Sequence, residues 1–219
     1  MITVHHLNQS RSHRILWLLE ELSLPYEVIY YRREKSMLAP PSLKRVHPLG
    51  KSPIVTDEGL TLAESGAIID YLETRYDGGH LFSPADSLGD SGLRYRYWLH
   101  YAEGSLMPLL VMKLIFSMLG KPPVPLLARP LGAAVGKGVQ RQYLDPQLAV
   151  HRQYVEDHLK TYPWFAGDQF SAADIQMSFP LEGLISRFGA ADFPHIRAFV
   201  ANIQSRPAYL RAQAREANK

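Results

Sequence analysis

The 219-residue chain contains no cysteine. This absence excludes disulfide bonds, thiolate metal sites and any mechanism that uses a cysteine nucleophile. It also fits a reducing compartment, and we expect the protein in the cytoplasm. The first residues, MITVHHLNQS, lack the basic start and the apolar core of a signal peptide. We therefore expect no secretory leader.

Long apolar runs are missing as well. The longest lies over residues 106–119 and is interrupted by Pro108, Lys113 and Ser117. A run of this length and polarity is too short and too polar to span a membrane. We therefore predict no membrane partner.

Neither sign of charge dominates the chain, because 24 Lys and Arg residues face 21 Asp and Glu residues. The longest basic cluster, Arg32 and Arg33, is followed directly by Glu34. Nucleic-acid binding needs a concentrated basic stripe, so we predict no nucleic-acid partner. The histidines form no His-x₃-His pair with a third ligand nearby, and we predict no metal.

The first part of the chain alternates between strand and helix patterns. Residues 2–7 and 26–31 are predicted strands, and apolar residues at helical spacing predict a helix over 15–22 between them. Such a β-α-β unit implies a parallel pair of strands. A short helical turn over 40–48 precedes a hairpin of residues 54–56 and 60–62, and a helix follows from Ser65.

Gly, Ser, Pro and Asp dominate residues 79–86, which is typical of a linker. The rest of the chain is predicted to be helical, with helices over 93–119 (bent at Pro108), 126–143, 145–162, 171–187, 194–205 and 208–217. The sequence therefore predicts an α/β domain over 1–79, a linker over 80–86 and an all-helical domain over 87–219.

The first chemically informative stretch runs from His47 to Val55 (HPLGKSPIV). Pro53 directly precedes a predicted strand, where it has no N–H to offer a neighbour. A cis bond between Ser52 and Pro53 would turn the chain sharply and expose the backbone of Ser52, which could then pair with an extended peptide. The alternative is an ordinary trans proline at a strand start, which is the commoner state.

The second stretch, LAESGAI, places Glu64 and Ser65 at a helix start. The free N–H groups of a first helical turn attract an anion, and a substrate carboxylate would suit them. Glu64 beside them could hold an ammonium group. A carboxylate and an ammonium at one end of a peptide describe a γ-glutamyl or α-amino acid group. The alternative is that Ser65 simply caps the helix.

The third stretch, NQSRSHR, lies between the first strand and the first helix. A thiolate placed here would be favoured by a serine O–H and by the helix dipole, since helix N-termini lower a thiol pKa from about 8.5. Lowering it by about two units requires about 2.7 kcal/mol, which one hydrogen bond to a charged group plus the dipole can supply. The alternative is that Ser10 or Ser12 only caps the helix; one capping serine would leave the other for chemistry.

Taken together, HPLGKSPIV followed one hairpin later by LAESGAIIDYL resembles the cytosolic glutathione transferase family. The N-terminal SRSHRILWLLEEL is similar to the first helix of its serine-type members, notably a bacterial and fungal group. In the second half, FSAADI matches the family's N-terminal capping box, in which Asp174 accepts a hydrogen bond from the Ser171 N–H. The resemblance implies a thioredoxin-like α/β N-terminal domain plus an all-α C-terminal domain, the glutathione transferase fold.

The resemblance also assigns roles to individual residues. A serine four residues before the arginine of the first helix stabilises the thiolate, which points to Ser10, with Ser12 as the runner-up. The matching glutathione contacts are Lys51, Ser52, Pro53, Glu64 and Ser65, with Pro53 in the cis form. No tyrosine ends the first strand and no cysteine begins the first helix, which argues against the tyrosine-type and cysteine-type mechanisms.

The pocket for a second substrate is predicted on the helix over 93–119. Tyr101, Met107, Met112 and Phe116 form a Met-rich, aromatic set that suits varied apolar ligands. Each of them could equally belong to the protein core.

The predicted function is therefore a glutathione transferase that activates the glutathione thiolate for attack on a small apolar electrophile. A glutathione peroxidase acting on a hydroperoxide, or another glutathione-dependent reaction, would use the same site. Glutathione is a co-substrate, and no cofactor is expected. The alternative is a non-catalytic glutathione-binding regulatory or stress protein of the same fold. The resemblance also implies a homodimer that pairs the first domain of each subunit with the helical domain of the other.

Overall fold

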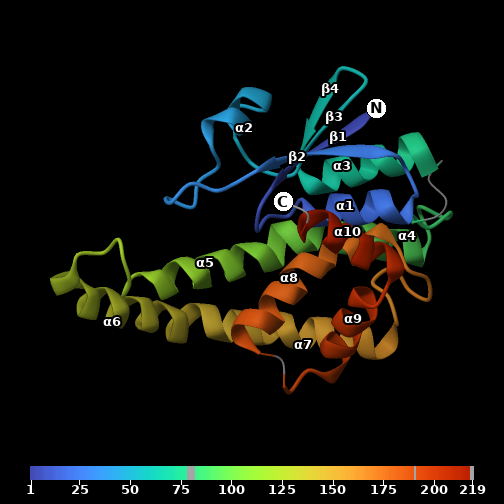
Figure 1. Cartoon of the computed structure of the whole chain (residues 1–219). Helices are drawn as coiled ribbons and strands as arrows, with labels where there is room; N and C mark the ends of the chain where they lie inside the picture. The colour runs from blue at the N-terminus through green and yellow to red at the C-terminus, as the bar shows by residue number, and fades with distance from the viewer. Residues whose placement is uncertain (78–81, 190, 218–219) are drawn as a thin grey trace.

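The computed structural model describes residues 1–77, 82–189 and 191–217, and Figure 1 shows their arrangement. A domain built on a four-stranded sheet is followed by a larger helical domain. The predicted linker over 80–86 begins outside the described residues. Its described part, residues 82–86, leads into the first helix of the second domain.

The sheet has the strand order β2-β1-β3-β4, formed by β1 (Ile2–Leu7), β2 (Tyr26–Tyr31), β3 (Ile54–Asp57) and β4 (Leu60–Ala63). β1 and β2 run parallel and are connected through helix α1 (His13–Glu21), whereas β3 runs antiparallel to β1 and pairs with β4 as a hairpin. Val4 stands at the centre, opposite Val28 on one side and Val55 on the other. These findings confirm the predicted β-α-β unit and hairpin.

Three further elements complete the first domain. They are α2 (Pro41–Val46), α3 (Ser65–Leu72) and a π-helical turn, η1 (Glu73–Asp77). Both α1 and α3 place their apolar faces in the core, so that Ile15, Leu16, Ile68 and Ile69 are fully buried.

The long helix predicted over 93–119 is present as α4 (Asp90–Tyr101), a π-helical turn η2 (Ala102–Leu106) and α5 (Met107–Met118). Pro108 lies in the first turn of α5, directly after the π-helical turn. Proline has no N–H for the helix interior, and the wider turn before it accommodates that loss without ending the helix. By length and composition alone Asp90–Met118 could cross a membrane, but it packs against α6, α7 and α8 of its own domain.

The next stretch differs from the sequence prediction. The sequence predicts separate helices over 126–143 and 145–162. In the structure α6 (Arg129–Val139), the π-helical turn η4 (Gln140–Leu144) and α7 (Asp145–Thr161) follow one another without leaving helical backbone angles. Pro146 again follows a π-helical turn, as Pro108 does. At both Pro108 and Pro146 the helix changes type before the proline and does not end there.

The hairpin of α5 and α6 projects from the body of the molecule, with the 3₁₀ turn η3 (Leu126–Ala128) near its tip (Figure 1). Its two helices approach closely at Gly132 and Gly136, where an added Cβ would lie 2.2 Å from the Leu119 carbonyl oxygen and 2.3 Å from that of Phe116. Glycine lowers the helix propensity of α6, but Gly132 and Gly136 allow this helix to pack closely against α5.

The last helices return to the first domain. α8 (Ala172–Phe188) and α10 (Pro207–Ala217) pack against α1, and α9 (Pro194–Gln204) packs against α7. Trp17 of α1 is fully buried, with its ring next to those of Phe170 and Tyr209. The predicted capping box of α8 is confirmed, since Asp174 accepts the Ser171 N–H at 2.7 Å.

Candidate active site

Three serines from two separate parts of the sequence, Ser10, Ser12 and Ser52, meet at the start of α1. The Ser10 hydroxyl oxygen lies 2.7 Å from that of Ser12 and 3.3 Å from that of Ser52. It also accepts the backbone N–H of Ser12 at 3.2 Å. The Ser52 hydroxyl donates to the His5 carbonyl at 3.1 Å. These hydrogen bonds thus join the end of β1, the start of α1 and the segment before β3.

Ser10 and Ser12 occupy different depths. Ser12 is fully enclosed, with its hydroxyl 2.8 Å from Nδ1 of His6, whereas Ser10 keeps 8% of its surface exposed. Ser12 is the N-cap residue of α1, but its side chain makes no capping hydrogen bond. Ser12 therefore does not cap the helix through its side chain, because Ser10 and His6 engage its hydroxyl. Ser10 is the serine whose hydroxyl accepts a backbone N–H at this helix start, that of Ser12.

The segment before β3 has the geometry that the family resemblance implies. The Ser52–Pro53 bond is cis. Pairing of β3 with β1 and β4 begins at Ile54, so the backbone of Ser52 lies outside the sheet ladder. Lys51 is exposed next to it. An extended backbone can therefore approach Ser52 at this edge.

Ser65 begins α3 and is buried. Its hydroxyl accepts hydrogen bonds from Nη1 of Arg14 at 3.2 Å and from Nε2 of Gln176 at 3.2 Å. Arg14 Nη1 also donates to Oε1 of Gln176 at 3.0 Å and to Oε1 of Glu103 at 2.7 Å. Ser65 is therefore held by Arg14 of α1 and Gln176 of α8, and Glu103 of the helical domain in turn holds Arg14.

Arg14 is a fully buried cation. Desolvation lowers the pKa of its guanidinium to about 10, although Glu103 opposes this shift. The guanidinium lies 5.1 Å from the centre of the Phe179 ring, and Nε and Nη2 have no hydrogen-bond partner among the described residues. Glu103 also binds Nε of Arg11 at 2.9 Å. One carboxylate thus supports two arginines across the domain boundary.

Glu64 has an unusual backbone. Its φ of +71° and ψ of 120° lie in a region that costs about 1–3 kcal/mol for residues other than glycine. The exposed side chain stands at the mouth of a cavity of about 650 Å³ between α3 and α4, which Ser65, Glu103 and Gln176 also line. Strained residues of this kind concentrate where a ligand needs a fixed group.

The sequence did not predict the hydrogen-bond partners of Ser65 and Arg14. Arg14 served only to locate Ser10, and Glu103 and Gln176 belong to no motif that we identified. Their partners lie 89 and 162 residues away along the chain. Only the packing of the helical domain on α1 brings them together.

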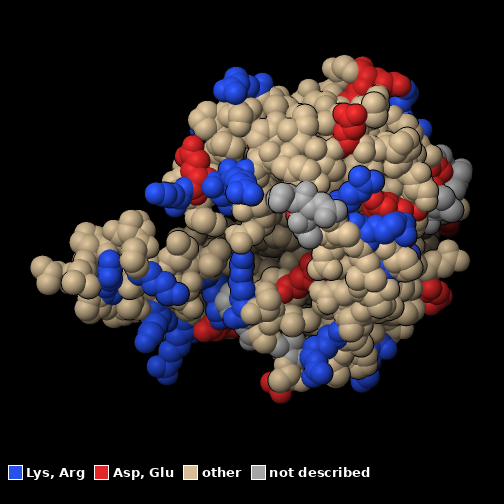
Figure 2. All heavy atoms as spheres, in the orientation of Figure 1, with Lys and Arg blue, Asp and Glu red and all other residues tan. Residues whose placement is uncertain are grey.

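The residues predicted for a second pocket separate in space. Met107 lines a cleft of about 410 Å³ between α5, α8, α9 and α10, together with Phe179 and Tyr209. Figure 2 shows the surface hollowed between the first domain and the arm of α5 and α6. Phe179 also stacks near Arg11, the neighbour of Ser10, at 5.7 Å. One wall of the cleft therefore lies near the side chain of Arg11, which follows Ser10 in the sequence.

Tyr101 does not join this cleft. Its hydroxyl contacts His151, and its ring packs against those of Trp98 and Tyr154 in the core between α4 and α7. Met112 and Phe116 are partly buried against the core and line neither of the cavities described so far. The sequence left open whether these three residues belong to the core, and their positions in the structure agree with that alternative.

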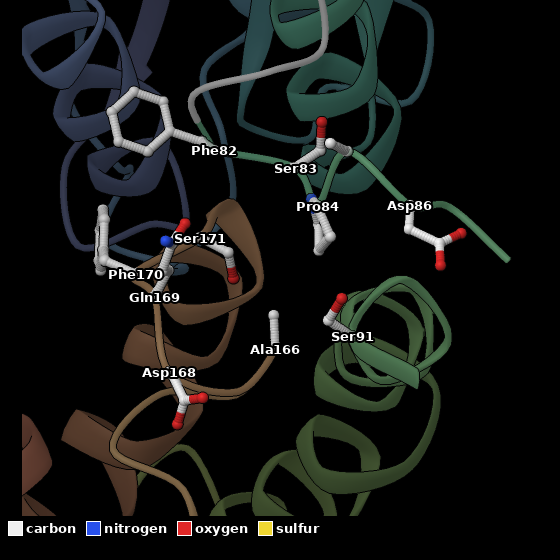
Figure 3. Close-up of a pocket in the computed structure, with 11 residues that line it drawn as sticks. Phe82, Ser83, Pro84, Asp86, Ser91, Ala166, Asp168, Gln169, Phe170 and Ser171 are labelled. Atoms are coloured by element: carbon white, nitrogen blue, oxygen red, sulfur yellow. The ribbon is translucent and has the colours of Figure 1, made fainter. Parts of the chain in front are cut away.

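A further cavity of about 410 Å³ lies at the domain junction. Figure 3 shows it between the segment of Phe82 to Asp86, the start of α4 at Ser91 and the loop before α8. The carboxylates of Asp86 and Asp168 stand on opposite sides of the view. None of the predicted site residues lines it, and we assign it no part in the chemistry.

Comparison with known proteins is consistent across the whole chain. The model of the glutathione S-transferase N-terminal domain matches residues 1–74, and that of the C-terminal domain matches residues 106–207. Glutathione S-transferase 3 of Schizosaccharomyces pombe is 37% identical over 213 residues, which cover 95% of this chain and 85% of that protein. Glutathione S-transferase 1 of Saccharomyces cerevisiae is 35% identical over 218 residues, covering 95% and 92%.

Solved structures agree with these matches. The crystal structure of a glutathione S-transferase from Actinobacillus pleuropneumoniae superposes with a TM-score of 0.80 at 37% identity, covering 98% of this chain and 92% of that one. A glutathione transferase of Phanerochaete chrysosporium, solved with oxidized glutathione, has the same fold with a TM-score of 0.76 at 20% identity. The chain therefore belongs to the glutathione S-transferase family and has its two-domain fold.

Proposed function

We propose that the protein is an active glutathione transferase in which the Ser10 hydroxyl holds the glutathione sulfur as a thiolate. The observation that carries this proposal is the position of Ser10. Its hydroxyl lies at the start of α1, keeps access to the surface, and is 3.3 Å from the Ser52 hydroxyl just before the cis-proline. A sulfur at this point meets both a hydroxyl donor and the positive end of a helix.

Glutathione, a tripeptide, has one group to match each of the contacts that Ser65, Glu64, Ser52 and Lys51 offer. Its γ-glutamyl carboxylate would lie at the N–H groups that begin α3 at Ser65, and its ammonium group beside the carboxylate of Glu64. The cysteinyl backbone would pair with the free backbone of Ser52, as an added strand does. Lys51 would meet the glycine carboxylate. Structural neighbours from Phanerochaete chrysosporium were solved with oxidized glutathione and with 1-(S-glutathionyl)-2,4-dinitrobenzene.

The second substrate would enter the cleft beside Arg11 that Met107, Val111 and Phe179 line. Its lining is more apolar than charged, and methionine adapts to ligands of different shape. The bound thiolate would attack an electrophilic carbon there, or the oxygen of a hydroperoxide. No side chain of the protein becomes covalently modified, because the nucleophile is the co-substrate.

Two further expectations belong to this proposal. The exposed rings of Tyr97 and Tyr154 on α4 and α7 lie 6.3 Å apart between their centres, and an apolar face of this kind supports a homodimer. The absence of cysteine supports a reducing compartment, and we propose a cytoplasmic protein.

The direct test is the variant Ser10→Ala. We expect calorimetry to show that glutathione still binds, because its backbone and charged contacts remain. The apparent pKa of the bound thiol should rise by about two units, which corresponds to about 2.7 kcal/mol, and turnover of an electrophile panel near neutral pH should fall about 100-fold. Unchanged turnover would remove Ser10 from this role.

The same experiment separates the alternative role. A chain that binds glutathione but turns over no electrophile and no hydroperoxide would be a non-catalytic glutathione-binding protein. If the unaltered chain neither releases heat with glutathione nor gains thermal stability from it, the glutathione site itself is refuted.

A further inference from the structure

The hydrogen-bonded chain that begins at Ser10 continues into the protein. From Ser10 it passes to the Ser12 hydroxyl at 2.7 Å, and from there to Nδ1 of His6 at 2.8 Å. Nε2 of His6 lies 3.6 Å from Oε1 of Glu216, in the last turn of α10. Ser10 and Ser12, directly before α1, thus form a path from the surface to the buried imidazole of His6 in β1, and Glu216 of α10 lies on the far side of the ring.

Titratable side chains of β2, α1 and α10 lie close to His6. Tyr30 of β2 meets its ring edge-on, with the ring centres 5.8 Å apart. His13 of α1 places Nδ1 3.4 Å from the same Glu216 oxygen. The Tyr30 hydroxyl donates to the Arg215 carbonyl at 2.6 Å, which fixes this end of α10 over β2. His6 itself is only 1% exposed.

The glutathione thiol must lose a proton for its sulfur to react. Ser10 can donate a hydrogen bond to a thiolate, but a neutral serine hydroxyl cannot store the proton that the thiol releases. Ser10 has two hydroxyl neighbours among the described residues. One of them, Ser52, leads only to the His5 backbone carbonyl, whereas Ser12 leads to the imidazole of His6.

We propose that His6 accepts the thiol proton through Ser12 and Ser10, supported by the carboxylate of Glu216. This inference rests on the proposed binding of the glutathione sulfur at Ser10. It makes His6 a positioning and proton-storing residue that touches no substrate, and it makes the C-terminal helix a functional part of the site.

The proton transfer balances as follows. In the structure Ser10 donates its one hydroxyl proton toward Ser52 at 3.3 Å. In the thiol state the S–H donates to Ser10, the Ser10 proton turns from Ser52 to Ser12 at 2.7 Å, and Ser12 donates to the Nδ1 lone pair of His6, whose Nε2 carries its single proton. Each hydroxyl then passes its own proton inward and receives one from outside. The S–H bond breaks and an Nδ1–H bond forms, while both serines remain neutral.

The product of this transfer is a thiolate at Ser10 and an imidazolium at His6. All hydrogen bonds of the path now point outward, so that Nδ1–H donates to Ser12, Ser12 to Ser10, and Ser10 to the sulfur. Glu216 faces the positive ring, and an opposite charge at this distance favours the charged imidazole. When the thiolate adds to a carbon that becomes a carbanion, the stored proton can return by the same path.

The decisive variant is His6→Asn, because the amide can still bond to Ser12 but cannot accept a proton. We expect the ultraviolet absorbance of the bound thiolate to titrate at least about one pKa unit higher than in the unaltered protein. The value of kcat/KM should then be about tenfold lower below the thiol pKa. The difference should vanish at alkaline pH, where solvent removes the proton.

The matched control is His5→Asn, in the next position of the same strand. His5 faces the other side, where its ring contacts Tyr31 and Thr56, and its carbonyl contact with Ser52 survives the change. This variant should keep the thiol pKa and the pH profile of the unaltered protein. Glu216→Gln should shift the titration in the same direction as His6→Asn, by a smaller amount.

Ser12→Ala breaks the path in the middle and decides the question if His6→Asn does not fold. Ser12→Thr restores a hydroxyl and should restore the pH profile. If either His6→Asn or Ser12→Ala binds glutathione with an unchanged thiol pKa and pH profile, the relay is refuted while the transferase proposal stands. If the unaltered protein binds no glutathione, the proposed function fails first, and this inference fails with it.

Discussion

Glu64 has a backbone conformation that costs stability, and its side chain lines the cavity of the candidate site. Its positive φ is a backbone state that glycine adopts freely and other residues rarely adopt. The adjacent Ser65 is held by Arg14 and Gln176, and these contacts fix the start of α3 directly after the strained residue. The strain therefore persists because the surrounding contacts define the backbone.

Replacing Glu64 by glycine should consequently separate stability from binding. We expect Glu64→Gly to raise the free energy of unfolding by about 1 kcal/mol and to weaken glutathione binding about tenfold or more through the lost charged hydrogen bond. Urea unfolding and calorimetry measure the two effects. Glu64→Gln keeps the strain and should lose affinity without gaining stability; equal stability of the two variants would contradict this account.

At the residue scale, the sequence predicted the positions that lie in local motifs. Ser10, Ser52 and Pro53 fall where their motifs place them, and the cis bond is present. Glu103 and Gln176 escaped prediction because their importance comes from a contact with Arg14, which no local pattern encodes. The pocket prediction was least informative for Tyr101, since a tyrosine on an amphipathic helix can face either the cleft or the core.

At the scale of elements, the sequence predicted almost every helix and strand but not how the helices join. Pro108 and Pro146 both suggested bends or breaks, because proline removes a backbone donor. In each case a π-helical turn ends just before the proline, and the helix continues. A π-helical turn contains one residue more than an α-helical turn, and the sequence pattern alone does not reveal it.

The α5–α6 arm offers an internal comparison between two glycines of one helix. At Gly136 an added Cβ would lie 2.3 Å from the Phe116 carbonyl oxygen, whereas at Gly138 nothing lies within 4 Å. We expect Gly136→Ala to destabilise the protein by about 1–3 kcal/mol, because the helices must separate. Gly138→Ala should stabilise it by about 0.5–1 kcal/mol through helix propensity.

Urea unfolding of both alanine variants measures this difference, with far-ultraviolet circular dichroism as the readout. Equal effects of the two substitutions would contradict the close approach of α5 and α6. An unchanged slope of unfolding free energy against urea would show that the denatured state is the same in both.

At the scale of the whole molecule, the core is continuous across the two domains. Buried residues of α1, α4, α8 and α10 belong to one cluster, and Arg14 links α1 to the helical domain through Glu103 and Gln176. The domains therefore hold each other in place, and the site lies where they meet. The order of elements was predictable, whereas this shared core emerges only from tertiary packing.

The exposed face of α4 and α7 leads to a prediction about assembly. Tyr97 is 47% exposed, Val150 67% and Tyr154 46%, and these side chains would be covered in the proposed homodimer. We expect sedimentation velocity to show a dimer for the unaltered protein and a monomer for Val150→Glu, since a buried unpaired charge opposes association. Leu88→Glu, at a residue 81% exposed before α4, is the control and should remain dimeric; a monomeric unaltered chain would refute the dimer.

The position of α10 has a consequence for biosynthesis. The strands and helices that carry Ser10, Ser52 and Ser65 leave the ribosome first, whereas the helix that covers His6 and His13 is translated after every other described element. The carboxylate neighbour of His6 is therefore the last part of the proposed proton path to leave the ribosome, and a chain that stalls before α10 would lack it.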